Sequence, residues 1–256
     1  MLSYIPQRKT IDALQSPPNR SRLQTRVQEQ VVFLQVPIYI ETSDRASLTT
    51  DFCAIDPGER TFVTTWSDRG VSEFGTMFGA RMFSRLVAMD KLRSKIDMEK
   101  DGRKKRRKKD AFGRLSQRMH NILKDFHYKV ASSLCDEYNN IIIPIFGTKE
   151  MISKKNRRLK TKTVRQMTCL GHAKFRERLL NVASRRGKNI FHVTEEYTSK
   201  TCCACGCLNE KLGGSRTFRC GDCGFTASRD IHGAFNIFLK FMKEHSATIV
   251  TEEHQR

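Results

Sequence analysis

The sequence predicts an α/β fold, in which a mixed β-sheet is flanked by helices and a small cysteine-rich ribbon precedes the last helix. Three observations support this prediction. Short apolar runs separated by turn residues form an antiparallel meander that begins near residue 50. Helical and strand patterns alternate after the meander. Two Cys-x-x-Cys pairs then stand close together in the last quarter of the chain.

Charge is the strongest compositional feature. The chain has 256 residues, a formal net charge of +20 and a pI near 9.9. Such an excess of cations favours a polyanionic partner, with nucleic acid first and a membrane surface second. No segment has eighteen uninterrupted apolar residues and the N-terminus has no apolar signal region, so we expect neither a membrane span nor secretion. Nine cysteines, four of them in metal spacing, favour a reducing intracellular compartment.

The first strands end at an acidic residue. Residues 1–30 are polar and predict a poorly ordered lead-in, and residues 31–40 predict an edge strand interrupted by proline. Residues 52–56, 60–66 and 71–74 predict the meander, with Asp56 closing its first strand. Asp-Pro-Gly is common turn chemistry. A carboxylate at the end of a buried strand is nevertheless costly without a partner, which favours a metal ligand.

Two amphipathic helices follow, at residues 77–100 and 115–134, with a run of seven consecutive cations between them. Most such runs are solvated and mobile. The alternatives are binding of nucleic-acid phosphates and a nuclear-import signal, and the sequence does not separate them. We predict nucleic-acid binding by Arg103, Lys104, Lys105, Arg106, Arg107, Lys108 and Lys109.

The second half alternates strand and helix. Residues 140–146 predict a buried strand, 154–165 a basic loop, 167–183 a helix and 189–193 a short strand. The last helix is predicted from Asp230 to about residue 243, and the final dozen residues are polar and expected to fray.

The cysteine pairs predict a metal site formed by Cys202, Cys205, Cys220 and Cys223. Fourteen residues separate the two pairs, close to the spacing of zinc ribbons, and four thiolates form a closed tetrahedral structural site. Cys203 and Cys207 fall outside the spacing. Nucleic-acid contact by ribbon cations is a secondary role, assigned to Lys211, Arg216 and Arg219.

Three acids are placed to meet at one sheet edge. They are Asp56, then Glu195 or Glu196 after the last strand, and Asp230 at the start of the last helix. An acid in a first helical turn is usually only a cap or dipole partner. Oxygen-only ligands favour Mg²⁺ or Mn²⁺, and two such ions about 4 Å apart support in-line phosphodiester hydrolysis.

Four sequence blocks resemble the nuclease half of the TnpB family, and most closely its eukaryotic and viral Fanzor relatives; type V CRISPR nucleases are more distant. The blocks are residues 54–63 (AIDPGERTFV), 125–131 (DFHYKVA), 143–151 (IPIFGTKEM) and 197–230, which opens with YTSKTC and closes with RD. The resemblance covers about residues 50–240. It implies a RuvC/RNase H-like fold, RNA-guided DNA cleavage, and DNA and guide RNA as partners.

The resemblance also assigns roles residue by residue. Asp56 corresponds to the first catalytic acid and Asp230 to the third. The usual second acid at the end of the fourth strand is missing, because Pro144 and Phe146 stand there. The Fanzor pattern instead places it before the YTSKTC block, which favours Glu195, while Glu196 and Glu150 stay open. His232 replaces a recurrent asparagine and is given no chemical role.

Domain boundaries follow from these assignments. We expect a lead-in or wedge-domain remnant at 1–50, a nuclease core at 51–197, the ribbon at 198–227, the last helix at 228–245 and a tail at 246–256. Family members carry a larger N-terminal half that holds the guide RNA. A truncated, catalytically inactive nucleic-acid-binding zinc-ribbon protein is therefore the alternative function. The sequence does not indicate an oligomeric state.

Overall fold

The computed structural model describes residues 51–145, 160–194, 196–210 and 215–253, with side chains as far as residue 245, and two strands before them. The chain divides into two compact units, residues 1–42 and 43–256. In the first unit, β1 (Gln24–Gln28) pairs antiparallel with β2 (Val31–Gln35). The expectation of an unstructured lead-in was therefore wrong for β1, and residues 36–40 of the predicted edge strand lie outside the described residues.

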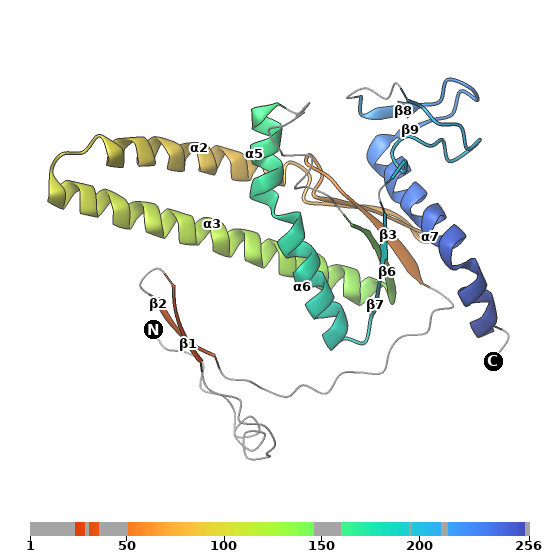
Figure 1. Ribbon diagram of the computed structural model, residues 1–256, viewed down its shortest axis with the longest axis horizontal. Coiled ribbons are helices and arrows are strands. Elements are labelled where there is room, and N and C mark those ends of the chain that lie inside the picture. Colours follow the sequence, from red (N-terminus) through yellow and green to blue (C-terminus); the bar gives the residue numbers. More distant parts are fainter. Residues whose placement is uncertain are drawn as a thin grey trace, which may run out of the picture. The chain divides into compact units, whose positions relative to one another are not determined.

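A five-stranded mixed sheet forms the centre of the second unit, in the order β5-β4-β3-β6-β7 (Figure 1). Its strands are β3 (Phe52–Pro57), β4 (Val63–Ser67), β5 (Gly70–Phe74), β6 (Asn140–Pro144) and β7 (Asn189–Val193). Strands β3, β4 and β5 form the predicted antiparallel meander, whereas β6 runs parallel to both β3 and β7. The predicted mixed sheet is confirmed.

Side chains alternate between the two faces of this sheet and build two separate cores. On one face, Cys53 and Ile55 of β3 pack with buried residues of α3 (Gly102–Glu137) and α6 (His172–Arg185). On the opposite face, Ala54 packs with Ile237 and Phe241 of α7 (Arg229–Glu253). Figure 1 shows α7 on one side of the sheet and α6 with the end of α3 on the other.

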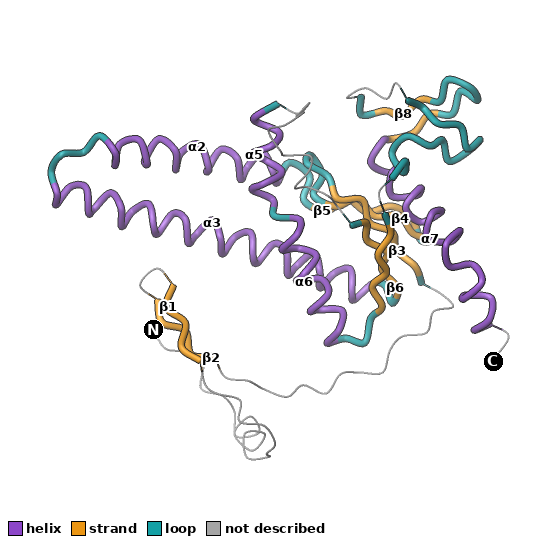
Figure 2. The backbone as a smooth tube through the Cα atoms, in the orientation of Figure 1, coloured by secondary structure: helices purple, strands orange, loops and turns teal. Residues whose placement is uncertain are grey.

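The helices differ from the prediction in three places. The cationic run forms the first turns of the 36-residue helix α3, which pairs with α2 (Phe78–Asp97) in a long hairpin (Figure 2). The helix predicted at 167–183 is two helices, α5 (Thr161–Leu170) and α6, and α5 begins inside the predicted basic loop. Helix α7 continues to Glu253, into the predicted tail.

Particular residues explain these differences. Asp101 caps α3 by accepting hydrogen bonds from the N–H groups of Arg103 and Lys104, at 2.8 and 3.0 Å. Gly171 adopts left-handed backbone angles (φ 61°), which end α5 and begin α6. Among the described helices, none is long and apolar enough to cross a bilayer.

Candidate active site and metal ribbon

Asp56 lies at the end of β3, on the sheet face that α7 covers. It is half-buried, and its backbone is paired with Thr64 of β4. Because strand side chains alternate, Asp56 shares a face with Ala54, which packs against α7. The central strand of the sheet thus directs this carboxylate toward the last helix.

Helix α7 approaches the Asp56 carboxylate through a glycine. A methyl group on Gly233 would lie 2.5 Å from Asp56 Oδ2 and 3.2 Å from its Cγ. Asp230, half-buried in the first turn of α7, is three residues before Gly233. Residues three apart are neighbours on a helix surface, with about 5–6 Å between their Cβ atoms. The fold therefore brings Asp56 and Asp230, which are 174 positions apart, to one place.

The second acid cannot be located in the same way. Glu195 and Glu150 lie outside the described residues, and the described strand β6 carries no acid. Glu196 is exposed. The Lys240 Nζ of α7 donates to Thr194 Oγ1 (2.5 Å) and to the Glu196 carbonyl (3.3 Å), so the residues on both sides of Glu195 are tied to α7.

The turn after Asp56 is supported from the opposite face. The Gly58 N–H donates to the Phe62 carbonyl (3.2 Å). A Cβ on Gly58 would lie 2.5 Å from the Thr61 carbonyl oxygen, so this close turn needs glycine. The buried His172, at the start of α6, is hydrogen-bonded to the Gly58 backbone. The position of the first acid is thus fixed by packing on both faces of the sheet.

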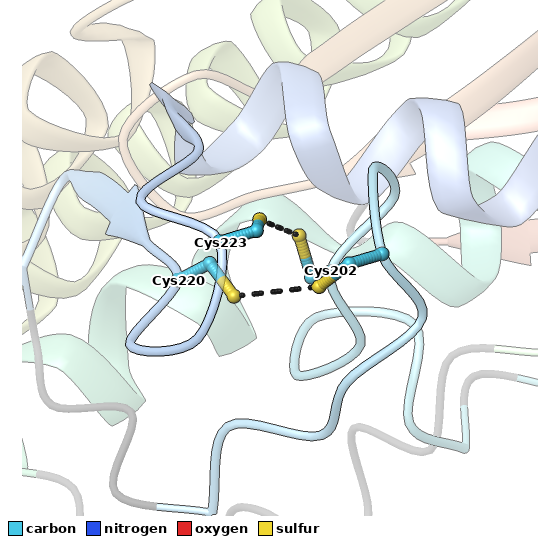
Figure 3. A group of neighbouring side chains, drawn as sticks. Cys202, Cys220 and Cys223 are labelled. Carbon is cyan, nitrogen blue, oxygen red and sulfur yellow. Dashed lines mark hydrogen bonds between the residues drawn. The ribbon is translucent and has the colours of Figure 1, made fainter.

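The four predicted cysteines converge on one point (Figure 3). Their Sγ atoms all lie within 4.8 Å of one another; Cys202 and Cys223 are 3.7 Å apart and Cys205 and Cys220 3.6 Å. Cys202 and Cys205 belong to one knuckle, while Cys220 and Cys223 follow strand β8 (Thr217–Arg219), which pairs with β9 (Thr226–Ser228). Four convergent thiols at these separations fit a tetrahedral zinc ion.

The second knuckle already favours a thiolate. Backbone N–H groups of Cys223 and Asp222 lower the pKa of the Cys220 thiol to about 7. Gly224, which follows this knuckle, has a left-handed φ of 73° that suits glycine. The ribbon core is small: Cys202, Phe218 and Cys220 are buried, with Phe225 packed against them. Such a core depends on a bound metal for its stability.

Two buried polar residues of α7 connect this ribbon to the helix. His232 stacks on Phe218, with ring centroids 3.8 Å apart, and its Nε2 accepts a hydrogen bond from the Cys203 N–H (3.3 Å). Asn236 Nδ2 donates to the carbonyls of Thr198 (2.7 Å) and Thr201 (2.8 Å). The sequence analysis gave His232 no role and did not single out Asn236. The available signal was a pair of polar residues four apart within an apolar helix.

The seven cations project from the first turns of α3, at the end of the α2–α3 hairpin remote from the sheet (Figure 1). Five of them are exposed, and Lys108 pairs with Glu99 (2.5 Å). Cations at a helix N-terminus oppose the helix dipole, so an anion at this end would relieve both the dipole and the mutual repulsion. Arg216 and Arg219 are exposed on the ribbon, whereas Lys211 lies outside the described residues.

A family model described as the TNB domain of Cas12f1-like proteins matches residues 172–237. The chain is 32% identical to a presumed transposase of Paramecium bursaria Chlorella virus 1, over 86% of this chain and 50% of that protein. It is 32% identical to a TnpB-like protein of Acanthamoeba polyphaga mimivirus, over 75% of this chain and 37% of the relative.

A bacterial relative and a solved structure extend the comparison. InsQ of Escherichia coli (strain K12), a presumed RNA-guided DNA endonuclease, is 27% identical over 66% of this chain and 47% of its own length. A chain of the CRISPR-Cas12f ternary complex superposes with a TM-score of 0.55 at 18% identity, over 80% of this chain and 41% of that chain. The chain thus shares its fold with Cas12f and spans at most about half the length of these curated relatives.

Proposed function

Because this chain belongs to the TnpB family, we propose that it is a metal-dependent DNA endonuclease, guided by RNA and associated with a transposon. Asp56, Glu195 and Asp230 would hold the catalytic divalent ions. The observation that carries the proposal is the approach of the Asp56 carboxylate to Gly233, one helical turn from Asp230.

Two features favour Glu195 as the second acid. Val193 is buried in the core that α7 forms with the sheet, and side chains alternate along a strand, so a continuing extended segment would direct Glu195 rather than Glu196 to that face. Strand β6, Asn140–Pro144, has no acid to offer. An acid in this position is the Fanzor pattern, and we assign the chain to that branch.

The carboxylates fit Mg²⁺ or Mn²⁺, because these ions prefer oxygen ligands. When bound, a pair of such ions supplies an activated water and stabilisation of the leaving oxygen for in-line displacement at phosphorus. The chain's own part is positional. Strand β3 and helix α7 hold Asp56 and Asp230 in rigid secondary structure, so little reorganisation is needed when a phosphate arrives.

The four cysteines fit a structural zinc ion, since the site consists of thiols alone and leaves no open position for a substrate. DNA and guide RNA are proposed as partners, supported by the net charge of +20 and the cationic end of α3. InsQ supports guidance by RNA, because that relative is named as RNA-guided.

Cleavage by the purified complex tests the proposal. The protein is co-expressed with the DNA that flanks its gene, purified with its bound RNA, and incubated with Mg²⁺ and a plasmid that carries the complement of that RNA. Asp56→Asn and Asp230→Asn remove one ligand charge each with little change in volume. Asp68→Asn, exposed in the turn between β4 and β5, is the matched control.

We expect cleavage by the wild type and by Asp68→Asn, and none by the two Asn variants or in the presence of EDTA. Cleavage that persists in both Asn variants would overturn the assignment of the acids. Nucleic acid bound by every form but cut by none would favour the non-catalytic nucleic-acid binder instead.

A further inference from the structure

Helix α7 carries two different surfaces on adjacent sides. At 100° per residue, Asp230, Gly233 and Ile237 lie on the side that faces the sheet and Asp56. Arg229, His232 and Asn236 follow the spacing i, i+3, i+7 and lie on a neighbouring side, which faces the ribbon. The helix that supplies the third acid is therefore packed between the nuclease sheet and the metal ribbon.

The ribbon holds its side of α7 at three successive levels. The Arg229 N–H donates to the Arg216 carbonyl (2.8 Å), where strand β9 continues directly into the helix. One turn later, His232 accepts from the Cys203 N–H, between the two cysteines of the first knuckle, and stacks on Phe218. One turn further, Asn236 uses both hydrogens of its amide on the carbonyls of Thr198 and Thr201. All three contacts are to backbone or ring groups whose position depends on the folded ribbon.

These contacts are buried, so they are exacting. His232 is 2% exposed, Asn236 6% and Phe218 fully buried. Loss of either polar side chain leaves buried backbone groups without their partners, which the helix can relieve only by moving away from the ribbon. A ribbon without metal has a core of two cysteines and one buried phenylalanine and cannot keep these groups in place.

We propose that His232 and Asn236 are positioning residues that transmit the metal-bound state of the four-cysteine ribbon to Asp230, so that the divalent-ion site at Asp56 and Asp230 forms fully only on a loaded ribbon. This inference rests on the proposed function. It makes the ribbon a structural condition for catalysis as well as a surface for nucleic acid.

Binding of Mn²⁺ tests the proposal without catalysis. The Mn²⁺ affinity of the full chain is measured by electron paramagnetic resonance in four proteins: wild type, Asn236→Ala, Cys220→Ser and the double variant. His232→Phe is a second, milder variant, because it keeps an aromatic ring against Phe218 and loses only the acceptor. Leu239→Ala, partly exposed on α7 and outside both contacts, is the control. Zinc content is measured in parallel.

Outer-shell partners of a metal site typically change its affinity about 10- to 100-fold. We expect a loss of that size in Asn236→Ala, His232→Phe and Cys220→Ser, with zinc retained in the first two and lost in the third. The double variant should be no weaker than Cys220→Ser alone, because both changes interrupt one connection.

The outcomes separate the two proposals. Wild-type Mn²⁺ binding that is insensitive to Asp56→Asn and Asp230→Asn would refute the proposed active site. Binding that depends on these acids but is unchanged in His232→Phe and Asn236→Ala would leave the active site standing and overturn the positioning role. Additive losses in the double variant would also overturn it.

Discussion

The core should lose stability in weak acid because two histidines are buried as neutral rings. His127 and His172 stack on Phe62, with ring centroids 5.1 and 4.8 Å away. His127 Nε2 donates to the Leu170 carbonyl (2.9 Å), which leaves Nδ1 to accept from Arg178 (2.7 Å). A proton on Nδ1 would face the Arg178 guanidinium.

Burial is the main cause of both shifts. It lowers the pKa of His127 from 6.5 to about 3, with Arg178, His172 and Lys174 lowering it further against the opposing effect of the Leu170 hydrogen bond. Burial likewise lowers the pKa of His172 from 6.5 to about 4, partly offset by its hydrogen bond to the Gly58 backbone. Both rings therefore stay neutral in the folded protein at pH 5.

The sign follows from proton binding. Below pH 6.5 the unfolded chain binds protons at both histidines and the folded chain does not, so stability falls as pH falls toward the folded pKa values. Between pH 7.5 and pH 5 each histidine removes about 2 kcal/mol from the free energy of unfolding, and the two together about 4 kcal/mol. This is a large part of the roughly 5–15 kcal/mol of a typical domain.

Urea unfolding followed by tryptophan fluorescence measures the effect. Trp66 is the one tryptophan of the chain and packs against Phe235 and Phe238 of α7, with centroids 4.6 and 4.7 Å away. In His172→Phe the loss between the two pH values should fall to about 2 kcal/mol, since one titrating group remains. His120→Gln, exposed on α3, should lose as much as the wild type.

A wild-type unfolding free energy that is the same at pH 7.5 and pH 5 would refute the reasoning. So would an equal loss in the wild type and in His172→Phe, because the acid response would then arise elsewhere in the chain.

Three further predictions follow from the packing and the charges. Cys220→Ser should release the ribbon metal and abolish slow amide exchange across residues 215–228; zinc content and exchange mass spectrometry check this, and retained zinc would contradict it. Phe241→Ala should cost about 3–5 kcal/mol in urea unfolding, because the ring is 1% exposed between α7 and the sheet, and a cost under about 1 kcal/mol would contradict that packing. Replacing Arg103, Arg106 and Arg107 with Gln should weaken nucleic-acid binding and reduce its salt dependence by about 0.7–0.9 per lost phosphate contact; an unchanged salt slope would exclude this end of α3 from the interface.

Local patterns were sufficient to predict the centre of the molecule. The alternation of residues 52–56 predicted β3 and placed Asp56 at its end, and the spacing of the cysteines predicted the ribbon site. These features depend on neighbouring residues or on ligand chemistry, both of which a sequence displays directly.

Long-range contacts decided what the sequence did not predict. Seven adjacent cations repel one another, yet they form a helix because the Asp101 cap begins α3 and buried residues such as Leu134 anchor its far end. The break at Gly171 was missed because the apolar spacing continues across it in phase. The contacts of Asn236 with Thr198 and Thr201 join segments 35 or more positions apart, which no local pattern reveals.

The measurement that tests the active-site assignment most directly is anomalous diffraction from crystals soaked in Mn²⁺. The account predicts an anomalous peak about 2–2.5 Å from carboxylate oxygens of both Asp56 and Asp230, lost in crystals of Asp230→Asn. Manganese bound elsewhere, with these two carboxylates in contact with neither ion nor peak, would contradict it.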